Sequence, residues 1–267
     1  MTKFPISPIF IPANKLNYID KALNSGADGI IFDLEDSILQ EDKRSARDNL
    51  YSFLANNSLN TISYIRINDL NTETGITDLD TFRDLSYEII IPKFETDKDF
   101  IKIPCTLSII PLIETPLAIR NLDKIASGKN VVGLAFGAAD FSSMIGSEMN
   151  WDAMLYARSK IIVECSINNI FSIDSPFMNA LDANGLESES KLSKSIGFNG
   201  KATINPSQIN IVKKYFLPTD EEIKEAKEII NEFKKSNKGV FSFKGQVIDK
   251  PVIKIMENRL MLSENNK

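Results

Sequence analysis

The sequence contains no histidine, only two cysteines and a single tryptophan. Without histidine, the common zinc sites are excluded, and a general acid or base must be Asp, Glu, Lys, Tyr or Cys. Cys105 and Cys165 show no motif spacing, so we expect reduced, packed thiols. Any protein ligands to a metal are therefore expected to be oxygen atoms, the donors that Mg²⁺ prefers.

Further absences narrow the class of protein. No run approaches the ~20 apolar residues of a membrane span, and residues 1–12 lack the basic start and apolar run of a signal peptide. The formal net charge is −5, and the Lys-rich stretch 224–238 alternates with Glu, so no basic stripe for nucleic acid stands out. We expect a cytoplasmic protein that binds neither membranes nor nucleic acid.

Short apolar segments recur along the chain, with helical periodicity between most of them. The eight segments are Ile9–Pro12, Gly29–Leu34, Ser63–Asn68, Tyr87–Lys93, Leu107–Glu114, Val131–Gly137, Phe171–Phe177 and Gly200–Pro206. Continuous apolar strands are typical of parallel sheets that are buried on both faces. The pattern predicts an α/β fold, a (β/α)8 TIM barrel, and the 267 residues match the roughly 250 of that class.

Apolar periodicity and Gly and Pro stop signals predict the helices. Those of the barrel are Lys15–Gly26, Glu41–Asn56, Thr77–Leu85, Glu95–Ile101, Thr115–Ser127, Asn150–Asn169, Asp182–Ile196 and Pro206–Phe216. After Leu217-Pro218 we expect a helix at 220–235, a hairpin or flap at 238–250 and a closing helix at 251–262. This predicts a barrel domain at 1–217 and a C-terminal helix–flap–helix extension at 218–267, packed on a barrel end or on a neighbouring subunit.

Polar side chains stand where the predicted strands end, which is where barrel enzymes carry their chemistry. They are Glu35, Asp36, Arg66, Lys93, Glu114, Asp140, Asp174 and Asn205. Glu114 and Asp140 follow two consecutive strands, so their carboxylates are expected to lie close together. Two carboxylates, completed by waters and substrate oxygens, are a usual ligand set for Mg²⁺. The alternative is that each residue caps the helix that follows it.

Two cationic side chains fall within or just after apolar strands. Arg66 would be costly to bury unless it is paired, so it either binds a carboxylate or developing enolate of the substrate or forms a structural ion pair with an acid such as Glu35. Lys93 could form a Schiff base, which needs a lowered pKa, although a metal site and a Schiff base are alternative ways to stabilise the same carbanion.

The sequence Asp33-Leu34-Glu35-Asp36 supplies three carboxylates at the end of the second strand. Strand alternation puts Asp33 and Glu35 on one side and Asp36 in the loop. We expect some of them, Glu35 and Asp36 included, to hydrogen-bond metal-bound waters or to orient Lys43. The alternative is loop solvation and helix capping.

Over nearly its whole length, the chain resembles the citrate lyase β-subunit-like proteins of the malyl-CoA lyase and HpcH/HpaI aldolase group. Each matching motif is short, but their order and spacing together are specific. The motifs are Phe10-Ile11-Pro12-Ala13-Asn14, Asp33-Leu34-Glu35-Asp36-Ser37 with Lys43 and Ala46-Arg47, Arg66-Ile67-Asn68, Ile91-Pro92-Lys93, Ile113-Glu114-Thr115, Phe136-Gly137-Ala138-Ala139-Asp140, Ala157-Arg158, Gly197-Phe198-Asn199-Gly200-Lys201 and Gly245-Gln246-Val247-Ile248-Asp249-Lys250-Pro251.

The resemblance implies a Mg²⁺-dependent carbon–carbon lyase that acts on a CoA or acyl-carrier thioester of a 3-hydroxy acid. It implies that Glu114 and Asp140 hold the metal, and that Arg66, with Ala138 and Ala139, contacts the substrate. It also implies that Asp249 of the C-terminal flap acts as acid or base on a neighbouring subunit's site, in a trimer or an assembly of trimers.

The chain departs from the family pattern in places. Ile6 stands where many relatives have Arg, Ala139 where an acidic residue often precedes the metal-binding Asp, and Asn205 where the family has His. The implied metal ligands are kept. The departures concern substrate choice and CoA contacts, for which Lys43, Arg47 and Lys201 are candidate lining residues.

Three functions remain open at this point. The first is a Mg²⁺-dependent hydroxyacyl-CoA lyase of the citramalyl-CoA, malyl-CoA or citryl-thioester type. The second is an aldolase that acts on free 2-oxo acids. The third is a citrate lyase β-type subunit that depends on a partner or an acyl carrier. The presence of Asp249 favours an independent enzyme over this third function.

Overall fold

The computed structural model describes residues 4–236 and 239–264, and it divides the chain into two compact units. The first unit runs to Lys213 and the second begins at Lys214. Each is described by itself below.

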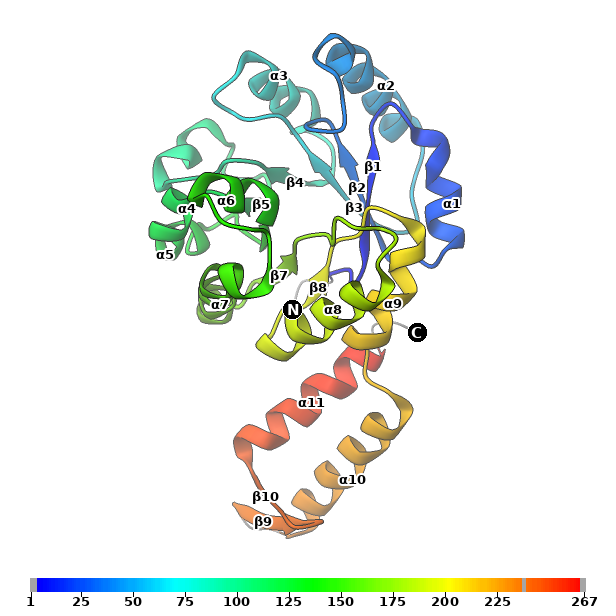
Figure 1. The fold of residues 1–267 in the computed structure, drawn as a ribbon, viewed down its shortest axis with the longest axis vertical. Helices are drawn as coiled ribbons and strands as arrows, with labels where there is room; N and C mark the ends of the chain where they lie inside the picture. Colours follow the sequence, from blue (N-terminus) through cyan, green and yellow to red (C-terminus); the bar gives the residue numbers. More distant parts are fainter. Residues whose placement is uncertain (1–3, 237–238, 265–267) are drawn as a thin grey trace. The chain divides into compact units, whose positions relative to one another are not determined.

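The first unit is a barrel of eight parallel strands in the order β1 to β8 (Figure 1). The strands are β1 (Pro8–Pro12), β2 (Gly29–Asp33), β3 (Ile62–Arg66), β4 (Glu88–Ile91), β5 (Ile109–Ile113), β6 (Gly133–Phe136), β7 (Phe171–Asp174) and β8 (Gly200–Lys201). Backbone hydrogen bonds from Phe10 to Thr203 and from Thr203 to Pro8 join β1 to the segment after β8. The TIM-barrel prediction is therefore confirmed, with each strand inside its predicted segment except for the first residues of β1 and β3.

Helices surround these strands (Figure 1). They are α1 (Ile19–Asn24), α2 (Lys43–Asn56), α3 (Glu73–Phe82), α4 (Pro116–Arg120), α5 (Leu122–Ala126), α6 (Ala138–Ile145), α7 (Trp151–Asn168), α8 (Ala183–Ile196) and α9 (Pro206–Phe216), with short 3₁₀ helices at Leu16–Tyr18, Gln40–Asp42 and Asp97–Lys102. The helix predicted at 115–127 is interrupted at Asn121, and the one predicted at 95–101 is a 3₁₀ helix. Helix α6, of eight residues, begins almost directly after β6 and was not predicted.

The barrel core lies beneath the carboxyl ends of the strands. Its buried side chains come from six strands, β2 to β7, and from the residue after β8: Ile31, Tyr64, Ile90, Ile110, Leu112, Ala135, Phe171, Ile173 and Ala202. Strands such as β2 and β5 are buried at every position, as expected for strands packed on both faces. This core leaves only the strand ends and their loops to form a site.

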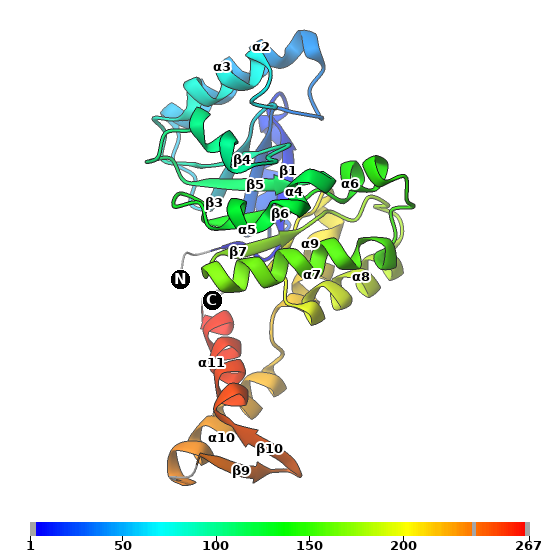
Figure 2. The same ribbon diagram turned by 90° about the vertical axis from the view of Figure 1, so that its left-hand side faces the viewer.

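The second unit consists of α10 (Asp220–Ser236), the antiparallel hairpin β9 (Val240–Phe243) and β10 (Gln246–Asp249), and α11 (Lys250–Glu264). Its two helices pack along one another and the hairpin connects them (Figure 2). Ala226, Ile229, Ile230, Ile248, Ile253 and Met256 form its own buried core. Within the described residues of both units, no helix has the length and apolar character needed to cross a membrane.

Candidate active site

A cavity of about 390 Å³ opens among the loops that follow the barrel strands. Its lining includes many of the residues predicted to act together: Arg66, Glu114, Ala138, Ala139 and Asp140, together with Asp33 and Asp36. The rest is mostly apolar, from side chains such as Phe10, Leu112, Phe136, Met149 and Met178. One wall therefore carries charge and the others are mostly apolar.

Neighbouring strands place Glu114 and Asp140. Glu114 directly follows β5, Asp140 lies in the first turn of α6 after β6, and the two strands pair at Ile113 and Phe136. The Thr115 hydroxyl caps α4 by accepting the Ala118 N–H, and the N-cap of α6 is Gly137. Neither carboxylate is thus the N-cap of its helix, which removes the capping alternative.

The Glu114 side chain is held on two sides. Its Oε1 accepts the Lys93 backbone N–H at 2.8 Å. On the other side, a Cβ on Gly137 would lie 2.6 Å from both Cβ and Oε2 of Glu114. Only glycine at position 137 leaves room for the carboxylate in this position.

Burial raises the pKa of Glu114 to about 8, and the nearby charges of Glu35 and Asp140 raise it as well. The hydrogen bond from the Lys93 N–H acts in the opposite direction, because it stabilises the ionised carboxylate. Burial also raises the pKa of Glu35 to about 7, although Arg66 opposes it. Without a cation, burial and the neighbouring carboxylates therefore disfavour the ionised forms of Glu114 and Glu35. An added divalent cation would relieve this repulsion.

The residues present fit a hard cation such as Mg²⁺. Glu114 and Asp140 are oxygen donors on one cavity, and Gly137 supplies the gap that lets the Glu114 carboxylate reach it. No group of three or more Asp, Glu or Cys side chains within residues 4–236 and 239–264 is placed to hold a metal. The protein would thus supply two carboxylates, as is usual for Mg²⁺, and leave the other positions to water and substrate.

Arg66 is bound by carboxylates from the last residue of β2 and from the loop that follows it. Its Nε and Nη2 each lie 2.8 Å from one oxygen of Asp33, and its Nη1 lies 3.1 Å from Oε2 of Glu35. The guanidinium also lies over the Phe10 ring, 4.9 Å from its centroid. The ion-pair alternative is therefore confirmed, yet Arg66 still lines the cavity, so it remains available to a substrate oxygen.

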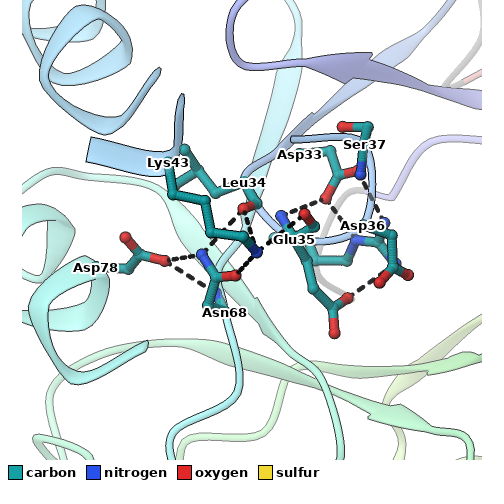
Figure 3. A network of polar contacts seen from close by, with 9 residues as sticks. Asp33, Leu34, Glu35, Asp36, Ser37, Lys43, Asn68 and Asp78 are labelled. Carbon is teal, nitrogen blue, oxygen red and sulfur yellow. Dashed lines mark hydrogen bonds and ion pairs between the residues drawn. The ribbon is translucent and has the colours of Figure 1, made fainter. Parts of the chain in front are cut away.

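Asp33 anchors the loop after β2 (Figure 3). Besides pairing with Arg66, its carboxylate accepts the backbone N–H groups of Glu35 and Ser37 at 3.0 and 3.2 Å. Burial alone would raise the pKa of Asp33, but the Arg66 guanidinium and these hydrogen bonds hold it below its usual value. Asp33 is thus an ionised partner that fixes the orientation of Arg66.

Lys43 does not bind the acidic side chains of this loop. Its ammonium donates to the backbone oxygens of Leu34 and Glu35 and to the Asn68 side chain (Figure 3). Asn68 in turn contacts the fully buried Asp78, whose other oxygen pairs with Arg47 Nε at 2.5 Å. Lys43 therefore holds the loop at the end of β2 by binding the backbone oxygens of that loop.

Sequence reasoning missed Asp78. The signal was a lone acidic residue on the buried face of α3, one position before Leu79 and four before Phe82. The structure also corrects the suggestion that Arg47 and Lys201 line a CoA groove. Arg47 is buried against Asp78, and Lys201 is fully buried in ion pairs.

A Schiff-base lysine needs a lowered pKa, whereas the pKa of Lys93 is raised. Burial lowers the pKa of its ammonium, but Glu35, Glu114, Asp140 and Asp69 together hold it above the usual value. Its backbone is left-handed, with φ of 51°, which is unusual for a residue other than glycine. The Schiff-base interpretation is thus disfavoured, and the strained backbone serves to direct the N–H at Glu114.

Asp249 belongs to the second unit, at the end of β10. Its Oδ1 accepts the Val252 N–H at 3.2 Å, so it contacts the first turn of α11. Among the departures, Asn205 accepts the Ser207 N–H at the start of α9, and Ile6 is buried with its N–H donated to Asp28. Ala139 is exposed at the cavity.

Comparison with known proteins gives consistent matches. The model of the HpcH/HpaI aldolase/citrate lyase family matches residues 7–206. The chain is 31% identical to the citrate lyase subunit beta of Leuconostoc mesenteroides subsp. cremoris, over 97% of this chain and 93% of that protein. It is 30% identical to the mitochondrial citramalyl-CoA lyase of Rattus norvegicus, over 97% of this chain and 86% of that protein.

The fold of a solved relative agrees. CitE of Mycobacterium tuberculosis, in complex with magnesium, acetoacetate and coenzyme A, superposes with a TM-score of 0.85 at 27% identity. The match covers 97% of this chain and 98% of that one. From its sequence, its fold and the cavity at its strand ends, the chain belongs to the HpcH/HpaI aldolase/citrate lyase family.

Proposed function

We propose that the protein is a Mg²⁺-dependent carbon–carbon lyase that cleaves, or in reverse forms, a 3-hydroxyacyl-CoA thioester such as citramalyl-CoA, malyl-CoA or citryl-CoA. The observation that carries the proposal is one cavity lined by Glu114, Asp140 and Arg66. The relatives named citramalyl-CoA lyase, and the CitE structure with magnesium and coenzyme A, support the same chemistry. The products would be an acyl-CoA and a 2-oxo acid.

Glu114 and Asp140 would hold the cation, which as a Lewis acid would polarise the substrate hydroxyl and the carbonyl that forms from it. Arg66 would meet the negative charge that develops on the thioester oxygen when the carbon–carbon bond breaks. Its two-point pair with Asp33 fixes the guanidinium before the substrate arrives, so little reorganisation is needed. The apolar walls of the cavity would exclude water once substrate is bound, which would strengthen both interactions.

We propose Asp249 as the acid or base, acting on the site of a neighbouring chain in a homo-oligomer, with a trimer favoured. A carboxylate at the end of a hairpin can be carried into a site when the hairpin closes, and desolvation would then raise its pKa toward that of a useful acid. This role explains why a small unit with its own core follows the barrel.

The test is an assay of the purified protein with Mg²⁺ and (S)-citramalyl-CoA, malyl-CoA and citryl-CoA, trapping the 2-oxo acid that is released. We expect release from one of the three that EDTA abolishes and added Mg²⁺ restores. Release that is insensitive to EDTA would contradict the metal role. No release from any thioester would reject the proposal.

The match to a citrate lyase beta subunit favours one second candidate, a subunit that acts on an acyl-carrier thioester within a complex. Turnover of a carrier-bound citryl thioester, with none of the CoA esters, would support it. Cleavage of the free 3-hydroxy acids alone would instead indicate a free 2-oxo-acid aldolase.

A further inference from the structure

A buried ionic cluster outside the proposed catalytic residues joins four elements of the barrel. Lys201 Nζ of β8 lies 2.9 Å from Asp174 Oδ2 of β7 and 2.6 Å from Glu189 Oε1 of α8. Arg158 Nε of α7 lies 2.9 Å from Asp174 Oδ1. The side chains of Lys201 and Asp174 are fully buried, and that of Arg158 is 2% exposed. We call these four residues the Arg158–Lys201 cluster.

Stability alone does not account for this cluster. Both cations and Asp174 have been removed from water, and the Glu189 side chain is only 17% exposed. Apolar side chains of similar volume often serve as well or better in such positions. What the charged groups add is fixed geometry, because each hydrogen bond has a defined direction. The Arg158 guanidinium is further confined by the rings of Trp151 and Phe136, whose centroids lie 4.6 and 5.4 Å away.

The cluster holds the segment that follows β7. Lys201 Nζ donates to the Ser175 backbone oxygen at 2.6 Å, and Arg158 Nη2 donates to the Ser175 hydroxyl at 3.3 Å. Lys201 Nζ also donates to Asp174 and Glu189, so these two bonds and the one to Ser175 use all three of its ammonium hydrogens. Ser175 is thus bound through both its backbone and its side chain.

The Ser175–Pro176 segment borders two cavities. It lines the 390 Å³ cavity described above and also a second cavity of about 250 Å³, which is lined by Arg158, Glu189 and Asp182 among others. Because empty space borders the segment in both cavities, close packing restrains it less than it restrains a segment enclosed by the core. Its hydrogen bonds to Lys201 and Arg158 add restraint with a defined direction.

We propose that Arg158 and Lys201 are positioning residues, which fix the Ser175–Pro176 wall so that the active-site cavity keeps its shape for the acyl part of the substrate. The kinetic consequence rests on the proposed lyase function, whereas the restraint on the wall does not. Loss of the cluster would let the wall move into the second cavity and weaken substrate binding. Glu114, which follows β5, and Asp140, in α6, would keep their affinity for Mg²⁺.

The main variant combines Lys201→Met with Glu189→Gln, which removes one charge of each sign and leaves the Arg158–Asp174 pair intact. Arg158→Lys is the conservative second variant, available if the double variant does not fold. Lys213→Met is the matched control, because Lys213 pairs with Asp28 at 3.7 Å and does not line either cavity. Circular dichroism checks that each variant is folded, and emission from the single tryptophan, Trp151, checks that the variants which keep Arg158 also keep its contact with the Trp151 ring.

The first readout is hydrogen–deuterium exchange of residues 171–175, where the Phe171 and Ser172 amides are hydrogen-bonded, and it does not depend on any activity. We expect exchange about tenfold faster in the double variant and unchanged exchange in Lys213→Met. Exchange as slow as in the unsubstituted protein, in a folded double variant, would overturn the proposal, and so would exchange that is equally fast throughout the barrel.

The second readout is steady-state kinetics with calorimetric Mg²⁺ binding. We expect KM to rise about tenfold, with kcat and Mg²⁺ affinity changed less than about twofold, because a displaced wall removes binding shared by ground and transition states. A merely structural role would lower the active fraction and leave KM unchanged, which would overturn the kinetic claim. If the unsubstituted protein releases no 2-oxo acid, the proposed function fails, but the exchange result still decides the positioning role.

Discussion

Arg66 and Asp33 form a two-point ion pair in which Nε and Nη2 each lie 2.8 Å from a different carboxylate oxygen. The pair joins the ends of β3 and β2, whose last residues are also paired in register. The pair therefore contributes to both the fold and the site, so a substitution at Arg66 is expected to affect stability as well as activity.

Substitution of Arg66 should cost activity and, when the charge is lost, stability as well. Arg66→Lys keeps the charge but loses the fork, so we expect kcat/KM to fall ~100-fold or more with a modest loss of stability. Arg66→Met leaves the buried Asp33 carboxylate unpaired and should destabilise the protein by about 3–5 kcal/mol. Urea unfolding measures the difference. Equal stability of the two variants would show that Asp33 does not depend on Arg66.

The metal-free protein should lose stability as the pH rises. Glu114 and Glu35 have folded-state pKa values of about 8 and about 7, above the usual 4.5, so the folded state holds more protons than the unfolded state between pH 4.5 and 8. Stability then falls as pH increases across that range. We expect Glu114→Gln to flatten this fall by an amount of the order of a few kcal/mol.

Urea unfolding in EDTA from pH 5 to pH 8 makes that measurement. The same titrations with Mg²⁺ should stabilise the unsubstituted protein at pH 8, because the cation binds only the folded, ionised site. Glu114→Gln should not respond to Mg²⁺. A response equal to that of the unsubstituted protein would remove Glu114 from the metal site.

Gly137→Ala should weaken the metal site specifically. The new Cβ would lie 2.6 Å from the Glu114 carboxylate, which must then move from the position that the Lys93 N–H fixes. We expect Mg²⁺ affinity to fall about tenfold or more, measured by calorimetry. Gly239→Ala is the control, since a Cβ there meets nothing within 4 Å. Unchanged affinity in Gly137→Ala would contradict the placement of Glu114.

The left-handed backbone at Lys93 predicts an unusual pattern of stability. Lys93→Gly should be about 1 kcal/mol more stable than Lys93→Ala, because glycine adopts a φ of 51° without steric cost and both variants keep the N–H that holds Glu114. Chemical denaturation compares the two variants.

Borohydride treatment with pyruvate should leave the unsubstituted protein unlabelled, as mass spectrometry would show. An adduct at Lys93 would support the Schiff-base mechanism instead.

If Asp249 acts on a neighbouring chain, two inactive variants should complement each other. Asp249→Asn has an intact barrel site and Glu114→Gln has an intact second unit. After mixing and exchange of subunits, we expect about a quarter of the unsubstituted activity, since that share of sites combines both intact parts. No recovery despite exchange, shown by mass spectrometry of the mixed oligomers, would place Asp249 in its own chain's site or outside catalysis.

Much of the barrel could be predicted because its strands are encoded locally. Segments such as Gly29–Leu34 and Leu107–Glu114 are continuous apolar runs, which only a sheet buried on both faces accommodates. Helix α6 and the break at Asn121 escaped prediction, because short helices between strand and loop are set by packing and backbone hydrogen bonds rather than by periodicity. The motif residues Glu114, Asp140 and Arg66 could be named in advance because strand ends gather at one face of a barrel.

The sequence by itself determined the kinds of groups available: oxygen ligands rather than histidine, eight apolar strands, and acidic residues with one Arg at their ends. Only the tertiary structure decided the partners. It paired Arg66 with Asp33, made Thr115 rather than Glu114 the helix cap, and enclosed Lys201 and Arg158 in one cluster against Ser175. The physical reason is that side-chain type is fixed locally, whereas burial, distance and hydrogen-bond direction arise only when residues far apart in the chain are packed together.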